Sequence, residues 1–251
     1  SLNSGVWQTT GGSFATQGLQ NLTAAMNVTV TGHSGANSAN LNVNRNDDYT
    51  GNWTINLGDG NDSLLSAKLK NGDSIDMGAG DDSVSVMLTG SNGTPSISAA
   101  NLTKLDGGAG TDTLQFEESG SNTSELTLTT AGATNFENII GTAGAETIKG
   151  DNNANVLTGK NGADTLYGYG GNDTLHADSN GSTNQTSADV LYGGAGNDTL
   201  YGNAGDNTLD GGTGADTIYS GGGSDTIVIR SGDGSTSLAT SPVIKDFTDN
   251  S

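Results

Sequence analysis

The sequence predicts an all-β solenoid in which short parallel strands stack as successive coils. Three observations predict it. A nine-residue unit repeats through residues 141–228, an aliphatic residue occupies the eighth place of every unit, and glycine recurs near the first, second and fourth places. A fixed period of this kind is typical of repeat architectures, in which each unit buries its apolar face only against its neighbours.

Each unit divides into a turn and a strand. In the unit at 193–201 the turn is GGAGND and the strand is TLY. Alternation along the strand points Leu200 inward and its two neighbours outward. One unit crosses half a coil, so the sixth place of a unit lies over the sixth place of the unit eighteen residues later. The inward eighth places are Ile148, Leu157, Leu166, Leu175, Leu191, Leu200, Leu209, Ile218 and Ile227.

The unit is strict only in the C-terminal half of the chain. Earlier residues show short alternating runs that are typical of half-buried strands, such as MNVTV at 26–30. The predicted parts are residues 1–140, an irregular β-helix with isolated units at 57–65, 77–85 and 107–115; residues 141–228, a regular solenoid with an insertion near 177–186; and residues 229–251, a cap or linker. Because insertions in solenoids fall on turns, we expect this one to bulge from one face.

The composition favours cations as partners. The 251 residues carry 28 acidic and 8 basic side chains, a formal charge of −20, which disfavours nucleic acid and anionic membrane surfaces. No apolar run approaches the roughly 18 residues of a membrane span. There is no cysteine to supply disulfides, and hydrophobic content is only 31%. The chain begins with Ser1 rather than Met, so we expect it to be a piece of a longer protein.

Calcium is the cation that the turns predict. Coils that stack at strand spacing, roughly 4.8 Å, bring sixth-place carboxylates close enough to repel one another. A hard dication cancels this repulsion and binds carbonyl oxygens, and Ca²⁺ accepts roughly six to eight oxygens in flexible geometry, whereas Mg²⁺ demands a tighter octahedron. With no cysteine and two histidines, zinc and copper sites are not expected. We therefore expect ordering to be coupled to the binding of several Ca²⁺ ions.

The repeated unit GGxGxDx(aliphatic)x resembles that of the RTX (repeats-in-toxin) calcium-binding family. The resemblance implies a right-handed parallel β-roll with Ca²⁺ between successive turns, type I secretion, and folding outside the cell. It makes ligands of the sixth-place carboxylates and of backbone carbonyls at places one and three. The implied carboxylates are Asp62, Asp82, Asp112, Asp164, Asp173, Asp189, Asp198, Asp216 and Asp225, and the implied carbonyls include Gly159, Asn161, Gly168, Gly170, Gly193, Ala195, Gly211 and Thr213.

Alternate units define two edges of the roll. One edge stacks Asp173, Asp198 and Asp216 without interruption. The other stacks Asp164, Asp189, Asn207 and Asp225, where an amide and the insertion weaken it. Glu146 and Asn155 also depart from aspartate at the sixth place. We expect the best-formed sites in the two gaps that Asp198 shares, with Asp173 and with Asp216.

Two functional hypotheses follow from the resemblance. The first is a calcium-binding structural segment of a large secreted bacterial surface protein, an S-layer protein or an adhesin, whose partners are Ca²⁺ and neighbouring copies of itself or cell-surface components. The second is an RTX module that aids export and folding of a secreted protease, lipase, epimerase or toxin. Neither HExxH nor GxSxG occurs in the chain, so no enzymatic activity is expected of it and a catalytic domain would lie elsewhere.

Overall fold

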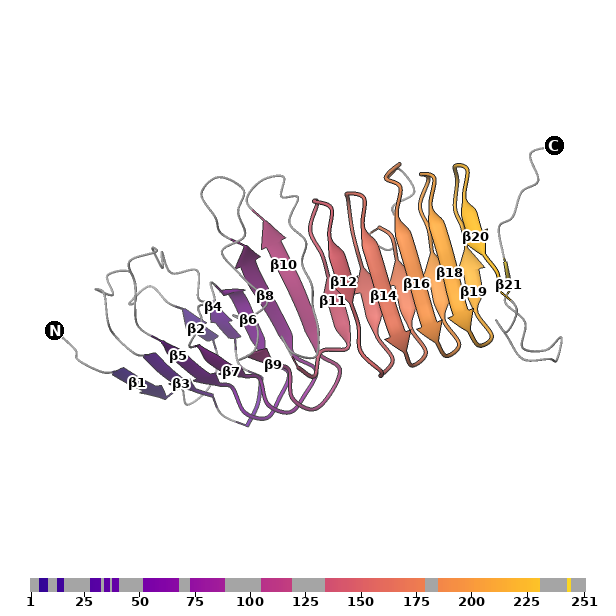
Figure 1. Ribbon diagram of the computed structural model, residues 1–251. Coiled ribbons are helices and arrows are strands. Elements are labelled where there is room, and N and C mark those ends of the chain that lie inside the picture. Colours follow the sequence, from indigo (N-terminus) through magenta and orange to yellow (C-terminus); the bar gives the residue numbers. More distant parts are fainter. Residues whose placement is uncertain are drawn as a thin grey trace. The chain divides into compact units, whose positions relative to one another are not determined.

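The computed structural model describes residues 5–8, 13–15, 28–32, 34–36, 38–40, 52–67, 73–88, 105–118, 134–178, 185–230 and 243–244. Within these ranges every regular element is a strand, every strand pairing is parallel, and no helix occurs, which confirms the predicted all-β fold (Figure 1). The chain divides into two compact units. The N-terminal unit comprises residues 1–119 and 130–136, and the C-terminal unit comprises residues 120–129 and 137–251.

The N-terminal unit contains two sheets of parallel strands. One sheet has the order β1 (Gly5–Gln8), β3 (Val28–Thr31), β5 (Trp53–Asn56), β7 (Ser74–Asp76), β9 (Leu105–Asp106). The other has the order β2 (Ser13–Ala15), β4 (Ser38–Asn40), β6 (Ser63–Ala67), β8 (Ser83–Leu88), β10 (Thr113–Glu118). Because hydrogen-bonded neighbours are alternate strands of the sequence, the chain gives one strand to each sheet in every coil.

The C-terminal unit follows the same rule with shorter coils. One set of strands is β11 (Asn138–Ile140), β13 (Val156–Thr158), β15 (Thr174–His176), β17 (Thr199–Tyr201), β19 (Thr217–Tyr219) and β21 (Val243–Ile244). The other is β12 (Thr147–Lys149), β14 (Thr165–Gly170), β16 (Val190–Ala195), β18 (Thr208–Thr213) and β20 (Thr226–Val228). Leu157 pairs with Leu175 and Leu200 with Ile218, so the register advances by the predicted two units.

The core contains a column of aliphatic side chains, one from the eighth place of each nonapeptide unit. The eighth-place residues from Ile148 to Ile218 are at most 1% exposed, and only Ile227, in the strand β20, is half-buried. Leu64, Val84 and Leu114 hold the same place in the N-terminal unit and are fully buried. Burial of one such side chain is worth roughly 1.5–3 kcal/mol, so the column is a main source of apolar stabilisation. Other buried side chains, such as Trp53, Met77 and Phe116, add to it in the N-terminal unit.

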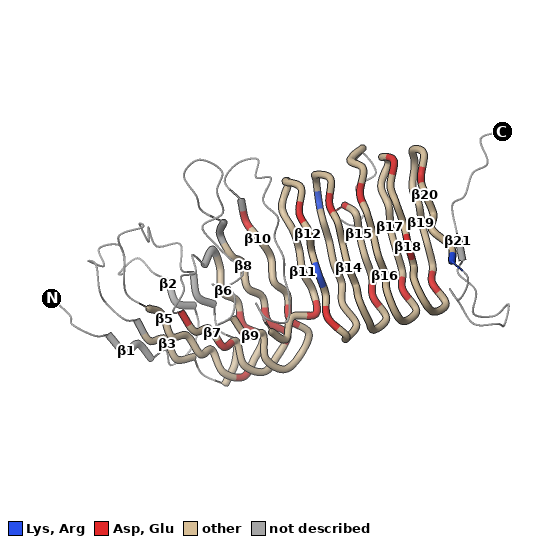
Figure 2. The backbone as a smooth tube through the Cα atoms, viewed as in Figure 1, with Lys and Arg blue, Asp and Glu red and all other residues tan. Residues whose placement is uncertain are grey.

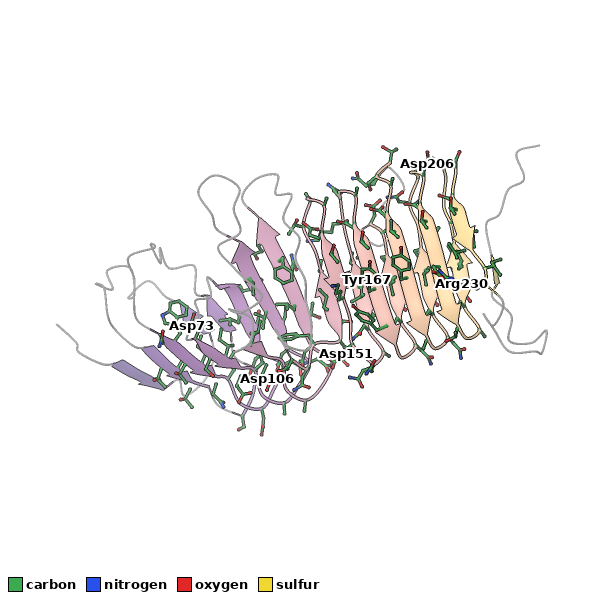
Figure 3. The ribbon with its side chains drawn as sticks, in the orientation of Figure 1. Asp73, Asp106, Asp151, Tyr167, Asp206 and Arg230 are labelled. Carbon is green, nitrogen blue, oxygen red and sulfur yellow. The ribbon has the colours of Figure 1, made fainter. Side chains whose placement is uncertain are left out.

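Aromatic side chains at ninth places stack along the outside of both sheets of the C-terminal unit. The ring of Tyr167, labelled in Figure 3, lies 4.8 Å from that of Tyr192, centroid to centroid. On the other sheet the Tyr201 ring lies between the rings of His176 and Tyr219, at 4.6 and 4.7 Å. Stacked rings add a modest stabilisation of about 0.5–1.5 kcal/mol per pair.

The predicted boundaries of the three parts of the chain stay predictions. Of the predicted insertion near 177–186, residues 179–184 lie outside the described part of the chain. Of the predicted cap at 229–251, only residues 229–230 and 243–244 are described. Within that region β21 pairs with β19, Val243 beside Thr217 and Ile244 beside Ile218, so a further strand follows the last strict unit.

Candidate metal centre

Acidic residues occur at the turns, at both ends of the strands of the C-terminal unit (Figure 2). Figure 3 shows Asp151 and Asp206 at turns on opposite edges of this unit. The turns stack closely because glycine holds the fourth place. Gly196 has φ of 137°, and a side chain there would collide with the carbonyl oxygen of Gly171 in the preceding coil. A residue with a Cβ is therefore excluded from this position.

Sixth-place side chains form a hydrogen-bonded ladder along the edge that carries Asp198. The backbone N–H of Asp173 donates to Oδ1 of Asp198 at 2.8 Å, and the N–H of Asp198 donates to Oδ1 of Asp216 at 2.9 Å. The ladder begins with the N–H of Asn155, which donates to Oδ1 of Asp173 at 2.8 Å. Each carboxylate thus uses one oxygen to hold the preceding coil in register.

The same ladder runs along the opposite edge and through the N-terminal unit. On the opposite edge, too, a backbone N–H donates to the side-chain Oδ1 of the next sixth-place residue. The pairs, donor first, are Glu146 and Asp164 (2.8 Å), Asp164 and Asp189 (2.7 Å), Asp189 and Asn207 (3.0 Å), and Asn207 and Asp225 (2.9 Å). In the N-terminal unit the N–H of Asp62 donates to Asp82 at 2.7 Å, and that of Asp82 donates to Asp112 at 2.8 Å. The aspartates therefore stack in the order that the period predicts, while their role as calcium ligands stays a prediction.

The second carboxylate oxygen of the ladder is the one that a cation could bind. Oδ2 of Asp82, Asp164, Asp173 and Asp198 is buried and accepts no hydrogen bond. A buried carboxylate oxygen without a donor is costly. These oxygens need a proton or a cation, and an ion of the hard, oxygen-binding class satisfies them without protonation.

First-place glycines let this second oxygen approach a backbone carbonyl of the next coil. A Cβ on Gly193 would lie 2.5 Å from Oδ2 of Asp198 and 2.6 Å from the carbonyl oxygen of Gly211. Gly168 faces Oδ2 of Asp173 and the carbonyl oxygen of Gly193 in the same way, and Gly159 faces Oδ2 of Asp164. The turns thus gather a carboxylate oxygen and a carbonyl oxygen, two acceptors, at one place.

The predicted third-place carbonyls lie further along the turn. Ala195 is in register with Gly170 on one side and Thr213 on the other. The carbonyl of Thr213 accepts a hydrogen bond from the N–H of Gly196 at 2.9 Å, which leaves it one lone pair for a cation. Asn161 is exposed at its turn. The structure therefore brings the first-place carbonyls to the carboxylates, while the third-place carbonyls remain predicted ligands.

Three turns that depart from aspartate at the sixth place satisfy their oxygens within the protein. Thr142 donates its hydroxyl and its N–H to the carboxylate of Glu146. Oδ1 of Asn155 accepts from the N–H of Asp151 at 2.8 Å. Nδ2 of Asn207 donates to the carbonyl oxygen of Gly205 at 2.8 Å. At these turns the sixth-place side chain is hydrogen-bonded within its own turn. At the regular turns Oδ2 of the sixth-place aspartate has no such donor.

Two buried aspartates at turns were missed by sequence reasoning. Asp73 is 1% exposed, and its Oδ1 accepts the N–H of Trp53 at 2.8 Å, twenty residues earlier, as the ladder carboxylates do. The order Asp-Ser-Ile at 73–75 repeats places six to eight of the unit and was the available signal. Asp178 is 5% exposed and follows the last strand before the insertion.

Burial raises the pKa of the ladder carboxylates. Burial raises the pKa of Asp164 to about 8 and, aided by the charges of Asp173 and Asp216, raises that of Asp198 to about 7. The hydrogen bond from the N–H of the preceding coil opposes the rise in both cases. Asp173 and Asp189 are raised to about 6, again chiefly by burial. The turns therefore favour a neutral or cation-bound carboxylate over a bare anion.

The donor set fits Ca²⁺. The turns offer carboxylate and carbonyl oxygens, which are hard ligands. Among the described residues no three acidic or histidine side chains surround one point, so an ion bound here must draw on backbone carbonyls as well. This combination of a parallel solenoid with oxygen-lined turns defines a class of protein, the cation-binding β-solenoids.

Comparison with a family model identifies the kind of repeat that the chain contains. The model of the RTX calcium-binding nonapeptide repeat, four copies, matches residues 140–175, 186–218 and 201–235. No curated protein matches the chain. The chain therefore contains RTX calcium-binding nonapeptide repeats, and these repeats bind Ca²⁺.

Filling the first-place space is expected to weaken one calcium site. In Gly193→Ala the new methyl group competes with Oδ2 of Asp198 and with the carbonyl oxygen of Gly211. We expect a destabilisation of about 1–3 kcal/mol, typical of overpacking, and weaker binding of Ca²⁺ in that gap. Thermal unfolding at saturating Ca²⁺ and calcium titration calorimetry measure the two effects.

Gly222→Ala is the matched control, because the nearest atom to its Cβ would be Cα of Ala204 at 3.6 Å. Its stability and calcium binding should equal those of the unchanged chain. Equal behaviour of the two variants would show that the space in front of Gly193 is not needed.

The raised pKa values predict opposite pH dependences for the metal-free and calcium-bound chain. Ladder carboxylates with a folded-state pKa of about 6 to 8 bind protons more tightly than in the unfolded chain. Without Ca²⁺, stability is therefore greatest below about pH 4 and falls as the pH rises through 6 to 8. Calcium affinity rises over the same window, by about tenfold per pH unit for each proton that the ion displaces.

Urea unfolding with a chelator and calcium titrations, each at several pH values from 5 to 8, test this pair of trends. Metal-free stability that increased with pH across this window would contradict the assignment of raised pKa values to the ladder. Calcium affinity that stayed constant with pH would do the same.

Proposed function

We propose that the chain is a calcium-dependent structural segment of a large bacterial surface protein, of the S-layer or adhesin kind, that is exported by type I secretion and orders outside the cell. The observation that carries the proposal is the ladder of buried carboxylates whose second oxygens have no donor, at Asp164, Asp173 and Asp198. Because the coils stack through this ladder, calcium acts on the scaffold itself.

The ligand set suits an environment rich in calcium. In the ladder each coil contributes one sixth-place carboxylate to an edge, so two carboxylates border each gap beside Asp198 and backbone carbonyls would complete the ligand set. Calcium affinity depends on ligand charge, and extracellular modules bind with dissociation constants of about 10⁻⁴–10⁻³ M. Sites of this strength would stay empty in the cytosol and fill after export, which supports folding outside the cell.

The described surface supports a scaffold role. The outward faces of the sheets carry threonine and stacked tyrosine rings, and no helix suited to crossing a membrane occurs among the described residues. The net charge of −20 allows Ca²⁺ to bridge neighbouring copies or anionic cell-surface components, which would otherwise repel the chain.

Antibodies raised against the chain test its location on intact cells of the source organism. We expect labelling without permeabilisation, and loss of conformation-specific labelling after a chelator wash. Labelling that required permeabilisation would contradict a surface location. The RTX-module alternative predicts instead that the parent protein contains a catalytic domain and that the purified chain stays monomeric at millimolar Ca²⁺ in sedimentation and electron microscopy, where the structural proposal predicts ordered assemblies.

A further inference from the structure

The turn that holds the insertion departs from the nonapeptide pattern at places one and two. Ala177 stands where the neighbouring coils have glycine, and its methyl group is fully buried. Asp178 stands at the second place, where the unit has glycine, and it lacks the positive φ that Gly194 and Gly212 adopt at this place. The space and the backbone shape that serve the regular turns are therefore altered here.

The sixth-place carboxylate of this coil is already satisfied. Oδ1 of Asp189 accepts the N–H of Asp164, as in the rest of the ladder. Oδ2 accepts from Nδ2 of Asn203 at 2.6 Å and from the hydroxyl of Ser187 at 3.2 Å. Asp189 therefore differs from Asp164, Asp173 and Asp198, whose second oxygens have no donor.

The amide of Asn203 has no hydrogen left for another acceptor. Its Nδ2 donates to Oδ2 of Asp189 at 2.6 Å and to Oγ of Ser187 at 2.9 Å. Its Oδ1 accepts from the N–H of Gly205 at 2.7 Å and from Nδ2 of Asn207 at 3.1 Å, which fixes the orientation of the amide. A planar amide has two N–H donors, and both are committed.

Asp178 is thereby left without a donor for either oxygen. The side chain is 5% exposed, and Oδ1 and Oδ2 are both buried without a hydrogen-bond partner. Its charge raises the pKa of Asp189, so the two carboxylates lie near each other. Burial raises the pKa of Asp178, and the Asn203 amide lies close enough to lower it, although both N–H groups of that amide are directed at Ser187 and Asp189. No basic side chain among the described residues pairs with it; Arg230 pairs with Asp210.

We propose that Asp178 holds a divalent cation, Ca²⁺, through its own carboxylate, beside Asp189 in the insertion coil, as a side-chain site that the nonapeptide motif does not contain. Both oxygens of Asp178 are available to the ion, and Asp189 adds negative charge next to it. A hard dication is the ligand class because the group that would bind it is a buried carboxylate, whose oxygens are hard ligands. The proposal goes beyond the sites of the regular coils, whose predicted ligands are sixth-place side chains and backbone carbonyls.

Counting bound calcium in the full chain tests this site. Asp178→Asn keeps the size of the side chain and removes its charge, and we expect equilibrium dialysis to find one ion fewer per chain than in the unchanged protein. Asp206→Asn is the matched control, since Asp206 is exposed and its Oδ1 accepts the N–H of Ser224 at 2.7 Å, which an asparagine oxygen also does. This variant should bind as many ions as the unchanged protein.

Asp178→Gly guards against a folding defect, because it introduces the residue that the repeat unit has at the second place. It should keep the coil folded and also bind one ion fewer. An unchanged count in both Asp178 variants, with a reduced count in Asp198→Asn, would overturn this site and leave the regular sites standing. A chain that bound no calcium at all would overturn both this site and the proposed function.

Discussion

Chelating Ca²⁺ at neutral pH is expected to unfold most of residues 141–228. Without the ion, the buried second oxygens of Asp164, Asp173 and Asp198 lie near backbone carbonyl oxygens and accept no hydrogen bond. The glycine-rich turns lose conformational entropy on ordering and have little apolar burial of their own to offset it. Far-UV circular dichroism should therefore change from a β spectrum to that of a largely disordered chain, and excess Ca²⁺ should restore it.

The loss of structure on chelation should be uneven along the C-terminal unit. Coils whose sixth place is satisfied by Thr142 or by the N–H of Asp151 do not depend on the ion in the same way. Hydrogen exchange in chelator should thus show the greatest residual protection near 141–158. Mg²⁺ at equal concentration is the control and should restore far less structure. A spectrum indifferent to the chelator would contradict coupled ordering.

Replacing Asp198 should be the most damaging single substitution in the ladder, because this residue borders two gaps. In Asp198→Ala the buried N–H of Asp173 loses its acceptor and the carboxylate disappears from both gaps. The unsatisfied donor alone costs about 1–3 kcal/mol. We expect the thermal midpoint in Ca²⁺ to fall by several degrees and calcium titrations to show weakened binding at two positions.

Asp198→Asn separates the two roles of this side chain. It keeps Oδ1 for the N–H of Asp173 and replaces Oδ2 by an amide donor, as Asn207 does naturally with the carbonyl of Gly205. This variant should stay folded and bind less calcium. Asp206→Asn removes the same charge from an exposed turn and should change neither property. Equal calcium binding in Asp198→Asn and Asp206→Asn would mean that Oδ2 of Asp198 is not a ligand.

The sequence was most informative where a local rule repeats. The eighth-place column and the stacking order of Asp173, Asp198 and Asp216 follow from the period alone, because strand alternation and coil length fix them. Asp73 was missed because the residues before it, KLKNG, lack most of the turn glycines, although its strand joins the same stack.

Contacts made by residues that depart from the nonapeptide pattern could not be predicted. The donors that satisfy Glu146 and Asn155 come from the second places of their own turns, which the motif assigns to glycine. In the sequence Asp178 marks only the start of an insertion. Its lack of a hydrogen-bond donor depends on Asn203, one coil later, whose amide donates to Ser187 and Asp189 instead. Such networks are decided by orientation in three dimensions, which residue type and spacing do not specify.

The hydrogen bonds of the ladder form whatever the number of residues between the two residues that they join. Successive rungs are 18 residues apart at Asp198 and Asp216, 25 at Asp173 and Asp198, 20 at Asp62 and Asp82, and 30 at Asp82 and Asp112, yet all four keep the same bond. Lengthening a flexible loop costs only about 0.6 kcal/mol for each doubling. The scaffold is therefore suited to grafting: foreign peptides could be displayed at its turns, with the coils on either side still locked in register.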